Sequence, residues 1–186
     1  MYYTSPDRSA LLEQLQSQSI KAICDADWKD LTIIRLPEIP NFTLLVGWTG
    51  QVAITDSLIQ ATEKKRKVET DSAFYKEFLI KSHAIVQGLQ SAWNQQEIPA
   101  LKEGIRANRT LLNEFAQVMQ LEIETPALQT LCALAEQNGA CAKTSGAGGG
   151  DCGICFTQNE TQRQQIETQW AKAQIQVLPL SIAEAW

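Results

Sequence analysis

The sequence has no long hydrophobic run, because no stretch of about 18 apolar residues occurs anywhere in its 186 residues. It also lacks a dense basic face: 16 Lys and Arg stand against 21 Asp and Glu, which gives a formal net charge of −5. These absences argue against a membrane-spanning segment. They also argue against nucleic acid or an anionic membrane as the main partner, since both attract clustered positive charge. The short basic run 64–67 is predicted to be a solvated linker between helices.

Targeting and metal-binding signals are also scarce. Residues 1–8 show no cationic segment followed by an apolar run, so we expect a cytoplasmic protein. His83 is the only histidine, and it is predicted to lie partly exposed on a helix. Cys152 and Cys155 have the spacing of a zinc or redox pair, but residues three apart on a strand face opposite sides. The odd number of five cysteines favours reduced, buried thiols, and no metal site is predicted.

The composition is that of an ordinary globular protein, with 44% hydrophobic and 20% charged residues. A chain of 186 residues is long enough to bury a substantial core. We therefore predict one folded domain that spans residues 1–186.

Periodic apolar residues and capping signals predict the secondary structure. A helix after the polar opening 5–7 would have Leu11, Leu12 and Leu15 on its apolar side. The other predicted helices start near Thr55 and span 68–93, 97–120, 125–139 and 159–173, and the predicted strands are 31–36, 42–46, 140–144, 153–157 and 175–180.

The order of these elements predicts the fold class. The helices are grouped apart from a small, antiparallel sheet, which is typical of an α+β fold. The two long helices are separated only by a short break at residues 97–99, so they are expected to lie antiparallel.

The densest chemical signal is a glycine-rich segment. Five of the ten glycines lie within residues 143–153, which read Lys-Thr-Ser-Gly-Ala-Gly-Gly-Gly-Asp-Cys-Gly. Successive N–H groups without side chains form a concave nest for an anion, and phosphate is the natural ligand. The segment fits neither the Walker A pattern nor the dinucleotide fingerprint. The alternative interpretation is a flexible hairpin connection between two strands.

Two segments together resemble a known family. Residues 143–154 resemble the third conserved motif of the GHMP small-molecule kinases, in the form found in phosphomevalonate kinases. Residues 45–55, Leu-Val-Gly-Trp-Thr-Gly-Gln-Val-Ala-Ile-Thr, resemble a second stretch of these enzymes, where a Gly-Trp-Thr turn ends a strand and a hydroxyl residue opens a helix. The resemblance implies the C-terminal domain of the family, with a small antiparallel sheet, several helices and a ferredoxin-like character.

The resemblance also implies an activity. The complete enzymes transfer the γ-phosphoryl group of Mg-ATP to phosphomevalonate, in the mevalonate route to isoprenoids. The implied cofactors are therefore ATP and Mg²⁺. The implied substrate- and phosphate-binding residues are Thr55, Lys143, Thr144, Ser145, Gly146, Ala147, Gly148 and Gly149.

Three further residues are weaker candidates for the site. Asp151 is either a metal ligand or base, or a residue that hydrogen-bonds the N–H groups of its own loop. Arg106 and Arg109 lie one turn apart on a predicted helix, where they either face solvent or reach the anionic substrate.

The family motifs that carry the catalytic Lys, the ATP-binding loop and the acidic residue have no match in the sequence. The resemblance therefore assigns no catalytic residue here. It predicts a C-terminal half that lacks the N-terminal ATP-binding domain and is inactive alone. An apolar surface left by the missing half would favour a homodimer. The alternative interpretations are another GHMP kinase, such as a mevalonate kinase, and a metabolite-binding module without catalysis.

Overall fold

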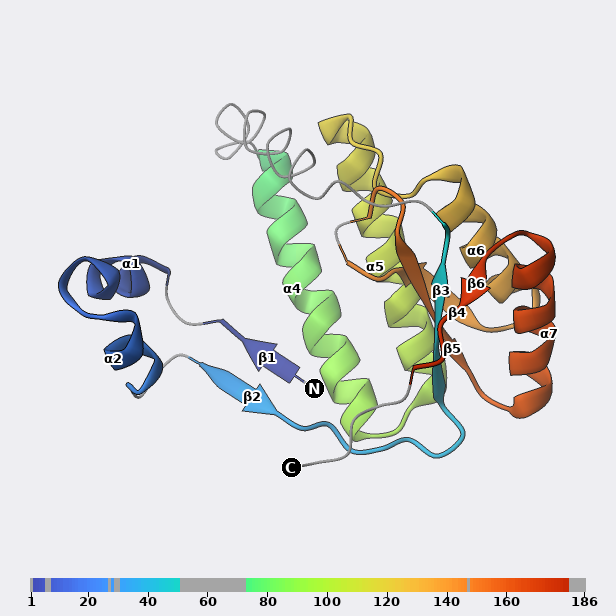
Figure 1. The fold of residues 1–186 in the computed structure, drawn as a ribbon, viewed down its shortest axis with the longest axis horizontal. Coiled ribbons are helices and arrows are strands. Elements are labelled where there is room, and N and C mark those ends of the chain that lie inside the picture. Colours follow the sequence, from blue (N-terminus) through green and yellow to red (C-terminus); the bar gives the residue numbers. More distant parts are fainter. Residues whose placement is uncertain are drawn as a thin grey trace. The chain divides into compact units, whose positions relative to one another are not determined.

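The computed structural model describes residues 2–5, 8–26, 28, 31–50, 73–146 and 148–180. The chain divides into two compact units, Met1–Glu38 and Ile39–Trp186, which are described separately here. Figure 1 shows the elements of both units. The predicted helix near Thr55 and the predicted linker 64–67 lie outside the described residues.

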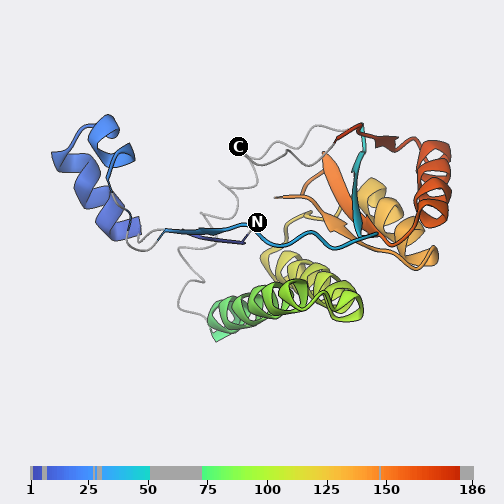
Figure 2. The same cartoon turned by 90° about the horizontal axis from the view of Figure 1, so that it is seen from below.

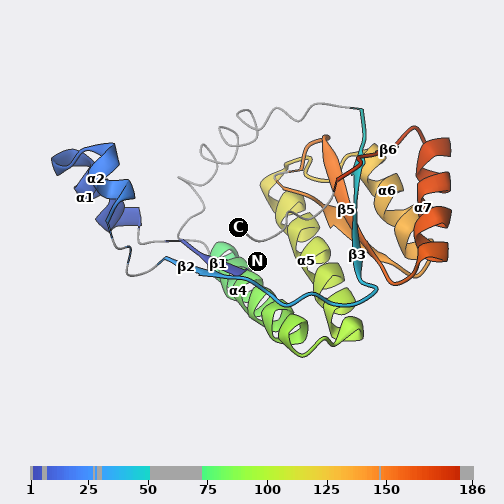
Figure 3. The same ribbon diagram turned by 60° about the horizontal axis from the view of Figure 1, so that its bottom comes forward.

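The first unit contains a two-stranded sheet and two short helices. β1 (Tyr2–Thr4) pairs antiparallel with β2 (Thr32–Ile34). Between them lie α1 (Arg8–Ser17) and α2 (Ile20–Cys24), which follow each other at one end of the strand pair (Figure 3). The sequence predicted α1 and β2 but missed β1 and α2. Leu12 and Leu15, predicted on the apolar side of α1, are 50% and 47% exposed.

The second unit is built on a four-stranded antiparallel sheet. Its strands are β3 (Thr43–Trp48), β4 (Cys141–Thr144), β5 (Cys152–Thr157) and β6 (Gln176–Val177), in the order β4-β5-β3-β6. Three of the described helices lie between β3 and β4 and one lies between β5 and β6, so the sheet has the ferredoxin-like β-α-β-β-α-β order with two additional helices in its first connection. The predicted α+β, ferredoxin-like fold is confirmed.

Four long helices complete the second unit: α4 (Ala73–Asn94), α5 (Ile98–Met119), α6 (Pro126–Gln137) and α7 (Glu160–Lys172). Figure 2 shows α6 and α7 on one side of the sheet and the α4–α5 pair on the other. Thr125 caps the start of α6 and Asn159 caps the start of α7, because their side chains accept backbone N–H groups of the first turns. Among the described helices, none is long and apolar enough to cross a membrane.

The core between the sheet and α6–α7 explains two of the glycines. Gly47 on β3 lies opposite Gly153 on β5. A Cβ atom on Gly47 would lie 2.8 Å from the ring of Trp170, and one on Gly153 would lie 2.7 Å from a methyl group of Leu131. Both strands therefore need glycine here so that α6 and α7 can pack closely.

Candidate functional site

The glycine-rich segment forms the connection between β4 and β5, called here the glycine loop (residues 145–151). The N–H group of Ser145 donates to the carbonyl of Cys152 at 3.0 Å, which closes the base of the loop. Gly148, Gly149 and Gly150 have φ angles of 78°, 83° and 135°. Side chains rarely adopt such angles, so this part of the loop requires glycine.

The loop is anchored on the segment that connects α5 to α6. The N–H group of Gly149 donates to the carbonyl of Ile123 at 2.8 Å. Gly148 lies so close to the same carbonyl that a Cβ atom would be 2.2 Å from its oxygen. The N–H groups of Gly148 and Gly150 have no acceptor among the residues that the structure describes. These donors are suited to binding an anion.

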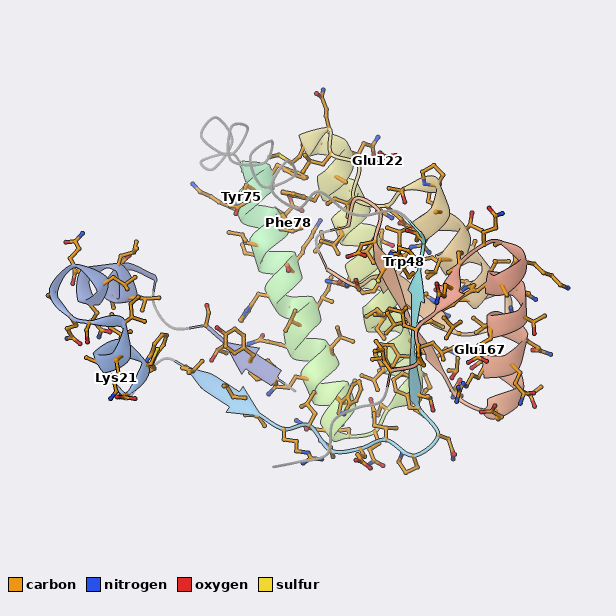
Figure 4. The ribbon with its side chains drawn as sticks, in the orientation of Figure 1. Lys21, Trp48, Tyr75, Phe78, Glu122 and Glu167 are labelled. Atoms are coloured by element: carbon orange, nitrogen blue, oxygen red, sulfur yellow. The ribbon has the colours of Figure 1, made fainter. Side chains whose placement is uncertain are left out.

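The end of β3 forms the second wall of the site. Thr49 donates two hydrogen bonds to the carbonyl of Asp151, one from its N–H group and one from its hydroxyl group, each at 2.9 Å. The Gly-Trp-Thr turn therefore lies directly against the glycine loop. Trp48, labelled in Figure 4, is half-buried on β3 opposite Cys152. Sequence reasoning named both segments but missed this contact, although each segment lies at the same end of a neighbouring strand.

Lys143 places a positive charge at the start of the loop. Its ammonium group is half-buried and donates to the carbonyl of Thr144 at 2.7 Å. Burial lowers the pKa of Lys143, and no carboxylate partner is found among the described residues. Ser145 and Gly146 are exposed, whereas Thr144 is buried. Thr55 and Ala147 lie outside the described residues.

Asp151 is exposed at the end of the loop, with a φ angle of 35°. Its carboxylate accepts a hydrogen bond from the thiol of Cys152 at 3.6 Å. Within the described part of the chain it accepts none from the N–H groups of the loop, contrary to one of the two interpretations of the sequence.

Three of the five cysteines, Cys132, Cys141 and Cys155, are buried, whereas Cys24 is exposed. Cys155 is fully buried and Cys152, on the other face of β5, is half-buried, so the two thiols do not form a pair. Burial raises the pKa of Cys132 to about 12 and that of Cys141 to about 11, which keeps both as thiols. In the described ranges, no three His, Cys, Asp or Glu side chains are placed to hold a metal ion. His83 is exposed on α4, as predicted.

Arg106 and Arg109 both form ion pairs inside the second unit. Arg106 donates to Glu136 at 2.8 Å and to the carbonyl of Ala140 at 3.1 Å. Arg109 donates to the carboxylate of Glu124 from two nitrogens, at 3.0 Å and 2.5 Å. Sequence reasoning considered solvent or substrate as their surroundings and missed these partners. Both arginines instead connect α5 to α6 or to the segment before it.

Glu124 gives the site region a predictable response to pH. Burial acts to raise the pKa of Glu124, but the hydrogen bonds from Arg109 and Asn113 and the charge of Arg109 hold it below its ordinary value of 4.5. A carboxyl with a lowered folded pKa stabilises the fold above its unfolded pKa, and this contribution is lost as the pH falls through the folded pKa.

We therefore expect Glu124→Gln to lower the free energy of unfolding at pH 7 more than at low pH. Urea denaturation of both proteins at several pH values measures this. The difference in unfolding free energy between them should stay constant from pH 7 to pH 5 and shrink below about pH 4.5. A difference that does not depend on pH would show that the charge of Glu124 adds nothing to stability.

Known proteins match the chain in both sequence and structure. Residues 95–176 match the family model for the C-terminal region of GHMP kinases. The chain is 34% identical over 183 residues to a phosphomevalonate kinase of a Streptomyces species, and this match covers 97% of the chain and 48% of the relative.

The structural matches agree. A Listeria innocua protein of known crystal structure superimposes with a TM-score of 0.87 and 32% identity over 95% of the chain and 49% of that protein. A Streptococcus pneumoniae phosphomevalonate kinase, solved with phosphomevalonate and AMPPNP, does so with a TM-score of 0.79 and 27% identity over 95% and 50%. The chain thus spans about half the length of these relatives.

The predicted resemblance to the C-terminal part of phosphomevalonate kinases is therefore confirmed. Residues 95–176 are similar to the C-terminal region of GHMP kinases, and nearly the whole chain is similar to about half of a phosphomevalonate kinase.

Proposed function

We propose that the chain supplies the substrate- and phosphate-binding part of a phosphomevalonate kinase. The complete enzyme would transfer the γ-phosphoryl group of ATP to phosphomevalonate and give diphosphomevalonate for isoprenoid synthesis. The observation that carries this proposal is the glycine loop, which follows Lys143 and Thr144 and in which the N–H groups of Gly148 and Gly150 have no acceptor among the described residues. The similarity to phosphomevalonate kinases supports the choice of substrate.

The proposed chemistry is one displacement at phosphorus. A phosphate oxygen of phosphomevalonate attacks the γ-phosphorus of ATP, the bond from that phosphorus to the bridging oxygen breaks, and ADP leaves. Such transfer depends mainly on positioning and on electrostatic stabilisation of the phosphoryl oxygens. We assign binding of a phosphate group to the loop residues Ser145, Gly146, Ala147, Gly148 and Gly149, together with Lys143, Thr144 and Thr55. The N–H group of Gly148, which has no acceptor among the described residues, and the exposed Ser145 hydroxyl would be among the donors. Asp151 remains a weaker candidate.

The cofactors of the complete enzyme would be ATP and Mg²⁺. The glycine loop fits a phosphate group, because its backbone donors carry no side chains. The described residues do not fit a metal ion bound by this chain alone, since they hold no cluster of three His, Cys, Asp or Glu side chains. Mg²⁺ commonly binds through substrate phosphates with one or two carboxylates.

The proposed partners follow from the length of the match. Because the chain spans about half of its relatives, activity would require the other, N-terminal half, which we propose carries the catalytic residues and most of the ATP site. Exposed apolar side chains such as Ile20 and Ile80, which are 74% and 70% exposed, would favour a homodimer when that half is absent. We place the complete enzyme in the cytoplasm.

A phosphoryl-transfer assay tests this proposal. ATP, Mg²⁺ and phosphomevalonate are supplied to the chain, to the N-terminal half encoded by the same genome, and to both together, and products are followed by phosphorus NMR. We expect diphosphomevalonate only from the mixture. Product from the chain alone would contradict the need for a second half. In a parallel assay with mevalonate as the acceptor, turnover of mevalonate alone would indicate a mevalonate kinase. Binding of phosphomevalonate without any turnover would indicate a metabolite-binding module.

Lys143→Met tests the charge at the loop, because it keeps the length of the side chain and removes the ammonium group. We expect the KM for phosphomevalonate in the mixture to rise about tenfold, since a charge-assisted hydrogen bond to phosphate is lost. Lys172→Met makes the same chemical change at an exposed position on α7 and should leave KM unchanged. Equal effects of the two variants would remove Lys143 from the site.

A further inference from the structure

The segment beneath the glycine loop has its own network of contacts. It is called here the shelf and comprises residues 121–125, between α5 and α6. α5 ends at Met119, and Gln120 after it has a left-handed φ angle of 49°. The N–H group of Leu121 donates to the carbonyl of Ala116 at 2.8 Å. Glu122, labelled in Figure 4, is exposed and marks the shelf at the upper end of α5.

Ile123 connects the shelf to the core and to the loop. Its side chain is buried with Phe115 and Met119 from α5, and Phe78 from α4 packs against this cluster. Figure 4 labels Phe78 on α4, beside α5. The carbonyl of Ile123 accepts the N–H group of Gly149, and both this carbonyl and a methyl group of the Ile123 side chain lie against Gly148. Any shift of this carbonyl would therefore move or release the glycine loop.

Glu124, the next residue, is held on three sides. Its side chain is 4% exposed, and it accepts hydrogen bonds from Arg109 and from the amide of Asn113. Its backbone carbonyl accepts the side-chain amide of Gln129 at 3.0 Å. Charge-assisted bonds of a buried carboxylate are about twice as strong as neutral ones. These contacts fix the backbone next to the Ile123 carbonyl.

We propose that Arg109 and Asn113 are positioning residues for the glycine loop. Both residues hold the carboxylate of Glu124, and this fixes the peptide group between Ile123 and Glu124. The carbonyl of that peptide group is the only acceptor that the described residues offer to the N–H groups of Gly148, Gly149 and Gly150. The role of this arrangement in phosphoryl transfer rests on the proposed function. The positioning itself is a property of this chain.

The geometry favours this role over a general contribution to stability. Arg106, one turn earlier on α5, forms a comparable ion pair with Glu136 and reaches Ala140, at the start of β4. Arg109 reaches the shelf, whose neighbouring carbonyl meets the loop. Loss of either arginine should therefore destabilise the unit, but only loss of the Arg109 contacts should act on the loop itself.

Amide hydrogen exchange of the full chain, resolved by NMR, tests this difference. The measured quantity is the exchange rate of the Gly149 amide divided by that of the Ser145 amide at the other end of the loop. In Glu124→Gln we expect this ratio to rise about tenfold, because loss of the charge weakens the contacts that hold the shelf. Arg106→Met is the matched control and should change both amides by the same factor.

A milder variant covers the case in which Glu124→Gln does not fold. Asn113→Ala removes one donor and keeps the Arg109 pair, so a rise of about threefold in the same ratio is expected. An unchanged ratio in the folded variants, or an equal rise in Arg106→Met, would overturn the positioning role. The kinase assay is independent of this result, so failure of the proposed function would leave the exchange measurement valid.

Discussion

Gly148→Ala is expected to lower the free energy of unfolding by about 2 to 5 kcal/mol. Two costs combine at this position. The φ angle of Gly148 is 78°, a conformation that costs other residues roughly 1 to 2 kcal/mol. In addition, the new Cβ atom would lie 2.2 Å from the carbonyl oxygen of Ile123, which is backbone and cannot rotate away. Urea denaturation of the variant and the unaltered chain measures the difference.

Gly139→Ala separates these two costs. Gly139 follows α6 with a φ angle of 72°, but the nearest atom to its Cβ position is the side-chain nitrogen of Gln162 at an ordinary 3.6 Å. This variant should therefore show only the conformational cost of roughly 1 to 2 kcal/mol. Equal losses in the two variants would mean that the glycine loop moves away from the shelf without cost.

Trp170→Ala is expected to remove about 3 to 5 kcal/mol of stability. Trp170 on α7 is fully buried, and its ring packs beside Gly47 at the centre of the sheet. Its indole N–H group donates to the carbonyl of Leu131 at 3.0 Å and so joins α7 to α6. Because domains are stable by about 5 to 15 kcal/mol in total, a large share of the fold's stability depends on this side chain.

Two further variants make this result interpretable. Trp170→Phe keeps one ring but loses the indole donor, so its loss of stability should be about half as large. Ile80→Ala removes a side chain that is 70% exposed on α4 and should stay within about 0.5 kcal/mol of the unaltered chain. A loss below about 1 kcal/mol for Trp170→Ala would contradict a core centred on this residue.

The elements with strong local signals could be predicted from the sequence. Thr125 before a proline, and Asn159 before a polar helix, mark the starts of α6 and α7, and the structure confirms both caps. The glycine-rich segment was also recognised, and it connects the paired strands β4 and β5. Its binding of an anion stays a prediction, because a hairpin connection was the alternative interpretation. The predicted strand 175–180 is shorter in the structure. Pro179 has no N–H group to continue the ladder.

Other features depend on contacts between distant residues. β1 and β2 have three residues each, too few to show a period of two, and they pair across 28 positions. The partner of Arg109 is likewise set by where α5 ends and α6 begins. The sequence offers a long arginine side chain several possible carboxylate partners, and only the tertiary structure determines which one it contacts. The shelf therefore had no sequence signal of its own.

The contact between Thr49 and Asp151 has a consequence for how the molecule folds. These residues are 102 positions apart, and the pairing of β3 with β5 that brings them together closes a loop of similar length. Closing such a loop costs conformational entropy before any contact compensates for it. Topologies dominated by distant pairings fold more slowly than those built from local ones. The glycine loop, its shelf and the adjoining turn are therefore expected to assemble late and together, because no short fragment of the chain contains them.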